Sequence, residues 1–201
     1  MNPFICILSI FLLSSCAHKN VQKASVEPGK TAVSGDIVNA SRLNSGGKLG
    51  LAVFKAGPGA QSDEQLDQIS LMLIKGINER LQEHQTSLIV TDDEDSADLI
   101  LQGYVEEFFQ PGKFDRWVKH KNRCRLSVSG EIWQRDTGTK VLTFASSQTI
   151  PLKAQHLDIA YRMGQAIGDF ILRSYERTVR ADRSLRSTPL SNLQQNKQES
   201  M

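Results

Sequence analysis

The feature that most constrains this chain is a short apolar run near its start, from Phe4 to Leu13. As an α-helix this run would be about 15 Å long, whereas the hydrocarbon core of a bilayer is about 30 Å thick. It is too short to cross a membrane, but it suits the hydrophobic region of a secretory signal peptide. Nothing after it reads as a second membrane segment, so we expect the rest of the chain to fold as a water-soluble body.

The run ends in Leu13-Ser14-Ser15-Cys16, and this pattern resembles the signal of bacterial lipoproteins. The resemblance implies that residues 1–15 are a signal peptide that is removed, and that Cys16 becomes a lipidated amino terminus carrying diacylglyceryl and amide-linked acyl chains such as palmitate. Each buried CH₂ contributes about 0.8 kcal/mol to membrane binding, so several chains would anchor the protein firmly. The alternative is an ordinary cleaved signal peptide that leaves Cys16 unmodified.

The residue after Cys16 bears on which membrane such a lipoprotein is sorted to. Ala17 stands there in place of the Asp that commonly retains lipoproteins in the inner membrane. The resemblance therefore implies an outer-membrane protein that faces the periplasm and contacts the membrane through its lipid.

The three cysteines fit this interpretation. Cys6 leaves with the signal and Cys16 takes the lipid, which leaves Cys124 without a disulfide partner. Cys124 lies in a strand-like alternation, so we expect it to be a buried small hydrophobe and not a reactive thiol. The four histidines are scattered, so we predict no metal site and no cofactor.

Composition and residue pattern divide the chain into four parts. We expect the signal at 1–15, the lipidated Cys and a flexible tether at 16–47, one α/β domain at 48–180, and a disordered polar tail at 181–201. The formal net charge is only +2, with 24 basic and 22 acidic residues. That balance argues against nucleic-acid binding.

Within the domain, apolar periodicity predicts an α+β fold with two layers. Strands are expected at 48–55, 87–91, 99–106, 124–132 and 141–150, and helices follow residues 62 and 157. The result is a mixed five-stranded sheet in the order β-α-β-β-β-β-α, packed with two main helices. Asp136-Thr137-Gly138 is the predicted hairpin turn, with Gly138 in the left-handed conformation.

The last helix, from Leu157 to Arg180, carries two further expectations. Gly164 and Gly168 would let it lie close to the sheet. Asp169 stands four residues before Arg173, so the two side chains are expected to pair on the helix surface.

Two groups of carboxylates are candidate sites. The acidic patch at residues 92–98 is dense enough to suggest Ca²⁺, but the glycine and glutamate of an EF-hand are not at the required spacing. A solvated loop is the preferred interpretation. Glu106 and Glu107 are neighbours in a strand, so they are expected to point to opposite faces and not to share a catalytic site.

One segment of the domain has an unusual surface. Residues 113–125 are rich in Lys and Arg and contain an aromatic residue within the basic run. Trp and Arg are favoured at protein–protein hot spots, so this segment is the predicted partner-binding surface. The alternative is a solvated loop whose Trp packs on its own sheet. The predicted contact residues are Arg116, Trp117, Lys119 and Lys121.

Two runs carry a further resemblance: residues 96–103, Ser-Ala-Asp-Leu-Ile-Leu-Gln-Gly, and residues 134–142, which include Asp136-Thr137-Gly138. They are similar to motifs of the periplasmic α/β domain shared by the curli-secretion channel lipoprotein, the amino-terminal domain of the Tol-Pal translocation protein and penicillin-binding-protein activator lipoproteins. The resemblance implies that fold and a habit of binding envelope partners, often as oligomers.

These expectations lead to a function. We predict a non-enzymatic outer-membrane lipoprotein that docks on, or helps to assemble, a cell-envelope complex through protein–protein contacts. A ring-forming component of a secretion or channel apparatus, which requires a homo-oligomer, is the alternative. An enzyme acting on peptidoglycan is less favoured, because no nucleophile–base pair is evident.

Overall fold

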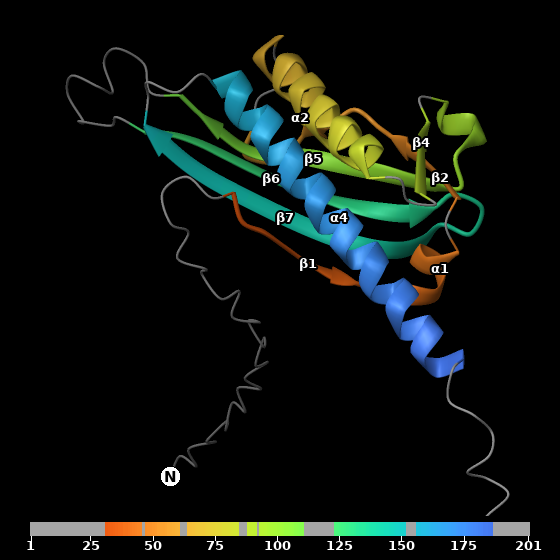
Figure 1. The fold of residues 1–201 in the computed structure, drawn as a ribbon. Coiled ribbons are helices and arrows are strands. Elements are labelled where there is room, and N and C mark those ends of the chain that lie inside the picture. Colours follow the sequence, from red (N-terminus) through yellow and green to blue (C-terminus); the bar gives the residue numbers. More distant parts are fainter. Residues whose placement is uncertain are drawn as a thin grey trace, which may run out of the picture.

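The computed structural model describes residues 31–45, 47–60, 64–84, 88–91, 93–110, 123–151 and 156–186. These residues form two layers, a twisted sheet and a pair of long helices that lie on one face of it (Figure 1). Among the described helices, none is both long and apolar enough to span a bilayer.

The sheet is mixed, as predicted, but it has seven strands and not five. Its order is β1-β7-β6-β5-β2-β4, and β3 pairs with β5 off this path. The pairs of β2 with β4 and β5, and of β3 with β5, are parallel, whereas the other pairs are antiparallel. The strands are β1 Val33–Ile37, β2 Gly47–Leu51, β3 Lys55–Ala56, β4 Leu88–Thr91, β5 Leu99–Phe109, β6 Arg123–Gln134 and β7 Thr139–Pro151.

Two elements lie inside the segment predicted to be a tether. Strand β1 pairs antiparallel with β7, with Val33 opposite Ser146. Helix α1, Ala40–Asn44, is capped by the Asn39 side chain and buries Leu43 completely. The expected domain start at residue 48 is therefore too late, because the described part of the fold already includes β1 and α1. Elements of five residues are too short to show hydrophobic periodicity, so the sequence did not predict them.

The first predicted strand, 48–55, is divided into β2 and β3. Between them Phe54 turns into the core, where its ring lies over Gly103. The Phe54 N–H donates to Ser70 Oγ at 2.8 Å. A side chain of the helix layer thus accepts the hydrogen bond of a backbone N–H at the point where the strand is interrupted. A larger residue at 103 would collide with this ring, because the glycine leaves room for it.

Helices α2, Glu64–Glu83, and α4, His156–Arg186, bury apolar stripes against the sheet. The apolar periodicity that predicts these two helices corresponds to buried side chains in α2 at Leu66, Ile69, Leu73, Ile77 and Leu81, and in α4 at Ala160, Met163, Ile167 and Ile171. Helix α4 continues to Arg186 and so enters the range predicted to be a disordered tail. That boundary was wrong because a polar segment can extend a helix whose preceding turns are held by packing.

The glycines of α4 face α2 and not the sheet. A Cβ at Gly164 would collide with the Leu73 carbonyl, and one at Gly168 would press on Arg80. From the other side, a Cβ at Gly76 would collide with the Tyr161 carbonyl. The prediction that these glycines serve sheet contact is therefore wrong. They let the backbones of α2 and α4 approach each other.

Local chemistry determines the structure at the end of the sheet where β6 turns into β7. Gly138 has φ +60°, which confirms the predicted left-handed residue of the β6–β7 turn. At the same end of the sheet, the connection from β4 to β5 contains the 3₁₀ turn η1, Glu94–Ser96. This connection crosses β2 at Gly50, where Ala97 Cβ would be 3.0 Å from an added Cβ. The acidic patch therefore lies on the face away from the long helices.

Candidate functional site

The face of the sheet opposite α2 and α4 carries no long helix among the described residues (Figure 1). We call the outward side chains of its central strands the open face. Their cross-strand partners follow from the register of β5, β6 and β7. The open face includes Gln102, Tyr104, Glu106, Glu107, Arg125, Ser127, Ser129, Glu131, Trp133, Lys140 and Ser147.

Polar side chains on the open face pair across the strands. Lys140 Nζ lies 2.5 Å from Glu131 Oε1, and Ser127 and Ser147 share a hydrogen bond of 2.8 Å. Arg125 lies 3.3 Å from a Glu107 carboxylate oxygen. Such cross-strand pairs each contribute only about 0.2–1 kcal/mol. The open face is therefore ordered by many weak contacts and not by burial.

Two aromatic residues stand within this polar array. The Lys140 ammonium lies 5.0 Å from the centre of the Trp133 ring, within range of a cation–π interaction. Tyr104, on the neighbouring strand β5, is 40% exposed. Since Trp, Tyr and Arg are the residues enriched at binding hot spots, Trp133, Tyr104 and Arg125 make the open face suitable for a protein contact.

The carboxylates of Glu106 and Glu107 lie on the same face, which overturns the prediction from strand alternation. The register shifts between Val105 and Glu107, so Glu106 is the extra residue of a β-bulge. Glu106 accepts a 2.5 Å hydrogen bond from Ser129 Oγ, while Glu107 pairs with Arg125, four residues from Ser129 on the same face of β6. Each carboxylate thus has its own donor, and both belong to the open face.

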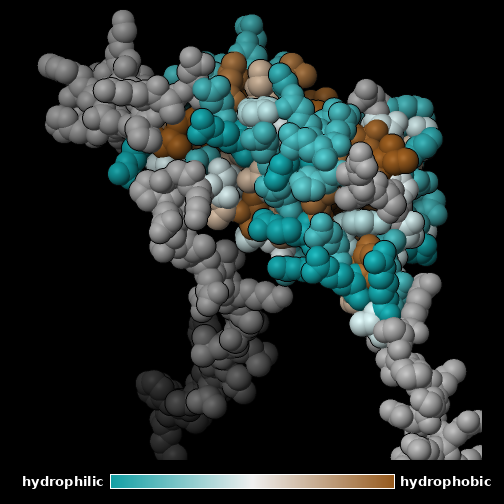
Figure 2. Space-filling model, viewed as in Figure 1, coloured by the Kyte–Doolittle hydropathy of each residue, from teal (hydrophilic) through white to brown (hydrophobic). Residues whose placement is uncertain are grey.

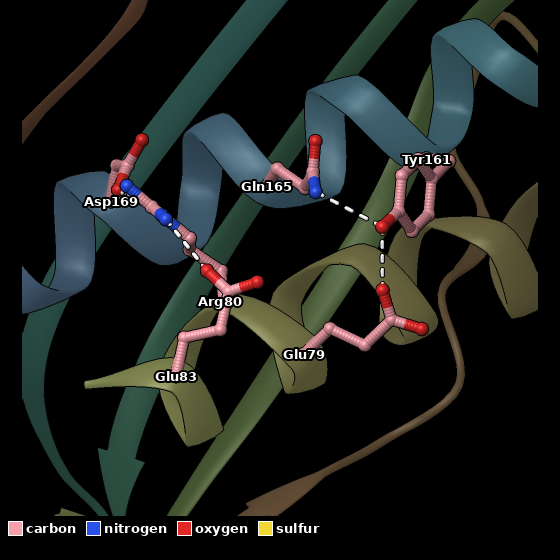
Figure 3. A network of polar contacts seen from close by, with 6 residues as sticks. All are labelled: Glu79, Arg80, Glu83, Tyr161, Gln165 and Asp169. Carbon is pink, nitrogen blue, oxygen red and sulfur yellow. Dashed lines mark hydrogen bonds and ion pairs between the residues drawn. The ribbon is translucent and has the colours of Figure 1, made fainter. Parts of the chain in front are cut away.

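The helix layer has a separate polar network, which Figure 3 shows between α2 and α4. Arg80 bridges the helices, with Nε 2.6 Å from Asp169 and Nη1 2.7 Å from Glu83. The hydrogen bond to Asp169 is the main reason why the pKa of Arg80 is raised. Asp169 was expected to pair with Arg173 through its carboxylate. Instead, Arg173 Nε donates to the backbone carbonyl of Asp169 at 3.2 Å. Because α2 and α4 approach each other closely at their glycines, the Arg80 side chain of α2 is within reach of Asp169 on α4.

The second part of this network centres on a phenol. Tyr161 Oη donates to Glu79 at 2.5 Å and accepts from Gln165 Nε2 at 3.0 Å (Figure 3). The hydrogen bond to Glu79, and then partial burial, raise the pKa of Tyr161. The surface over both helices is mostly hydrophilic (Figure 2), and the contacts of Arg80 with Asp169 and of Tyr161 with Glu79 join α2 to α4 across it.

The predicted site residues fall largely outside the structure's described ranges. Cys16 lies there, and so do Arg116, Trp117, Lys119 and Lys121, whose segment joins β5 to β6. These assignments stay predictions. Cys124 is confirmed as buried, and burial raises the pKa of its thiol. Within the described ranges, no group of three or more His, Cys, Asp or Glu side chains is placed to hold a metal.

A hollow of about 360 Å³ lies at the end of the sheet where β5 begins and β6 ends. The two motif runs named above meet here, because Arg135 N donates to the Asp98 carbonyl at 3.0 Å. Asp98 also accepts from Lys48 N at 2.8 Å, which ties the site to β2. Sequence reasoning missed this hollow. It is lined by Ala97, Asp98, Gln134, Arg135 and Asp136.

Comparison with known proteins assigns no family to this chain. No family model and no curated protein matches the chain. A PelC dodecamer from Paraburkholderia phytofirmans is 11% identical, with a TM-score of 0.48 over 69% of this chain and 96% of that one. Lipoprotein GNA1162 from Neisseria meningitidis is 9% identical, with a TM-score of 0.42 over 63% and 98%. A putative lipoprotein from Caulobacter crescentus is 18% identical, with a TM-score of 0.37 over 69% and 94%.

Two of these three proteins are thus named as bacterial lipoproteins. Similarity at this level assigns no function to this chain. None of the three names refers to the curli-channel, Tol-Pal or penicillin-binding-protein-activator group, so that finer resemblance stays a prediction.

Proposed function

We propose that this chain is a lipid-anchored protein of the bacterial cell envelope that docks on a protein complex, and that it acts by binding and not by catalysis. Two features support the proposal. The sequence Leu13-Ser14-Ser15-Cys16 supplies the lipid anchor. The open face supplies a contact surface on the folded domain.

The observation that carries the docking role is the position of Tyr104, Trp133 and Arg125 on a sheet face without a helix over it. Large side chains with both apolar and polar parts contribute most to binding when a partner excludes water from them. The surrounding Ser and Glu side chains are already paired with each other, so a partner meets a surface with few unsatisfied groups.

The predicted contact segment adjoins this surface. It joins the end of β5 to the start of β6, and Arg125 lies on β6 just beyond it. The chain arrives at the same end of the sheet from its amino-terminal side, where Thr31 Oγ1 donates to Gln148 at 2.9 Å. A tether from Cys16 would therefore enter the domain at the end of the sheet where β5 ends and β6 begins.

The anchor is tested by labelling cells with a palmitate analogue. The intact chain should incorporate the label and fractionate with the outer membrane, while Cys16→Ser should lose both properties. A Cys124→Ser variant is the control, since that thiol is buried. Equal labelling of wild-type and Cys16→Ser protein would contradict the anchor.

The docking role is tested by cross-linking the intact lipidated protein in cells and recovering the complex. Tyr104→Ala and the double variant Arg116→Ala/Trp117→Ala should each recover less partner than wild type. Arg162→Ala is the control for Tyr104→Ala, because Arg162 is exposed on α4 and lies away from the open face. Recovery that is equal for all variants would remove both surfaces from the account.

A further inference from the structure

Positive charge is concentrated in the carboxyl-terminal half of α4. Residues 156–172 of this helix contain two carboxylates and one Arg, whereas residues 173–183 contain four Arg and two carboxylates. All four of these Arg residues are exposed. They are Arg173, Arg177, Arg180 and Arg183. The half of α4 that leads away from the contact with α2 is therefore basic.

Three of these residues lie on one side of the helix. At about 100° per residue, Arg173, Arg177 and Arg180 fall within an arc of about 60°. The buried residues Ile167 and Ile171 lie on the opposite side of the same helix. We call Arg173, Arg177 and Arg180 the arginine face. It points away from the core and into solvent.

The arginine face lies beyond the end of α2. Arg80, near the end of α2, is paired with Asp169 and with Glu83, so the two carboxylates at this junction already have a cation. Arg173 is one turn further along α4. Figure 1 shows α4 continuing past α2 alongside α1, on which Arg42 is also exposed. The carboxylates of the helix layer therefore leave this end of the domain positively charged.

Interactions within α4 do not account for this charge. The helix dipole favours cations only within about the last turn, whereas Arg173 lies more than three turns before the last residue of α4. Arg180 lies 3.9 Å from Glu176 with 83% of its side chain exposed, so this pair contributes little. Among the described residues, Arg177 makes no ion pair. The guanidinium groups of the arginine face therefore remain available to an anionic partner.

The shape of the arginine face favours an extended anionic surface over a single small anion. Its three residues are spread along about 10 Å of helix axis, on the convex outer side of the helix. Arg binds phosphate oxygens through paired N–H donors. A bilayer that contains anionic lipids presents many phosphates in one plane, and each Arg of the face can meet a different one.

We propose that the arginine face contacts the phosphate headgroups of the bilayer that carries the Cys16 lipid. This inference rests on the proposed lipid anchor and adds an orientation to it. Helix α4 lies on the membrane, and the open face, on the other side of the sheet, points away from the bilayer towards a partner. The 15 residues that follow Cys16, up to Thr31, span at most about 50 Å, and α4 is about 46 Å long. The tether therefore lets either end of the helix reach the membrane.

The test measures how close α4 lies to the headgroups in vesicles that carry the lipidated protein. A fluorescent donor is attached at Ala181→Cys, exposed on α4, and the acceptor is carried on lipid headgroups. Cys124 is buried and Cys16 carries the lipid, so the label is confined to position 181. Energy transfer should be higher with phosphatidylglycerol in the vesicles than with phosphatidylcholine alone, and it should fall as NaCl screens the charges. The same donor at Ala145→Cys, exposed on the other side of the sheet, should show no such difference.

Charge reversal identifies the residues responsible. Each Arg close to an anionic surface favours the bound orientation about fivefold, so Arg173→Glu/Arg177→Glu should lower the ratio of bound to free orientation at least about thirtyfold. Lys48→Glu/Lys55→Glu is the matched control, because it changes net charge equally at exposed positions on β2 and β3. It should leave energy transfer high. Sodium phosphate should have the same effect as NaCl at equal ionic strength.

Equal energy transfer in the two kinds of vesicle would overturn the proposal. So would an equal loss in the two double variants, which would assign the attraction to net charge, or a stronger effect of phosphate than of chloride, which would make the face a small-anion site. Flotation with neutral vesicles reports the anchor separately. Protein that floats but shows no difference in energy transfer contradicts only the arginine face. Protein that fails to float contradicts the anchor, and its recruitment by anionic vesicles, if lost in Arg173→Glu/Arg177→Glu, would still support the arginine face.

Discussion

The two faces of the sheet are built from the same strands but are held in different ways. On the helix side of β5, Leu101 and Val105 are fully buried under the helix layer. One residue along the strand from Leu101, Gln102 is exposed, and Tyr104 beside Val105 lies on the open face. The alternation of the strand thus separates residues that stabilise the fold from residues available to a partner.

This difference has an energetic basis. Burial of apolar side chains contributes about 25 cal/mol per Å² removed from water, and the helix side carries most of that area. On the open face, exposed ion pairs contribute between about 0 and 1 kcal/mol each. The helix side should therefore tolerate little change, whereas the open face can vary without loss of the fold.

The largest expected effect is a cavity on the helix side. Leu101→Ala removes a side chain with no exposed area, so it should lower the free energy of unfolding by about 2–5 kcal/mol. Gln102→Ala, its neighbour on the exposed side, should change it by less than about 0.5 kcal/mol. Urea unfolding followed by circular dichroism measures both. Similar losses of unfolding free energy for the two variants would contradict the claim that the helix side of the sheet, and not the open face, stabilises the fold.

The next effect concerns the approach of the two long helices. Gly164→Ala places a methyl group against the Leu73 carbonyl, so α4 must shift away from α2. We expect a loss of about 1–3 kcal/mol, although Ala is intrinsically the better helix former by about 1 kcal/mol. Thermal unfolding of Gly164→Ala and of Ala166→Gly, a change in the same helix turn, gives the test. A stabilised Gly164→Ala variant would show that the helices are not in close contact.

A smaller effect comes from the polar surface of the helix layer and depends on pH. The pKa of Tyr161 is raised in the folded state, chiefly by its hydrogen bond to Glu79. The contribution of this bond to stability is fully present below the unfolded pKa of about 10 and is lost as pH rises through the folded value. The stability difference between wild type and Tyr161→Phe should therefore shrink above pH 10. Tyr161→Phe should also remove one late-titrating phenol from the ultraviolet titration.

The smallest effect on stability is expected on the open face. Arg125→Ala removes a half-exposed partner of Glu107 and should cost less than about 1 kcal/mol. If the open face is a docking surface, the same variant should nevertheless reduce recovery of the cross-linked complex. A large loss of stability with unchanged recovery would reverse the roles assigned to the two faces.

Sequence periodicity predicted the helix side well. The stripe from Leu66 to Leu81 and the alternation in β5, β6 and β7 follow from which residues must leave water, and the structure confirms them. The same reasoning did not show which surface each glycine meets. Gly164 faces α2 and not the sheet, because periodicity gives the buried side of a helix but not its neighbour.

The open face and the edges were predicted less well. One extra residue at Glu106 shifts the register, and no local signal in Val105-Glu106-Glu107 announces it. Strand β1 has only five residues and depends on β7 for its structure. The hollow could not be predicted, because it forms where residues 97–98 and 134–136 meet in the folded chain.

The most direct test of the account is photo-cross-linking in living cells. A photoreactive amino acid at Tyr104, on the open face, should yield a cross-linked adduct, while the same group at Arg162, exposed on α4, should yield none. Adducts from position 162 and none from position 104 would contradict the claim that partners meet the sheet on its helix-free side.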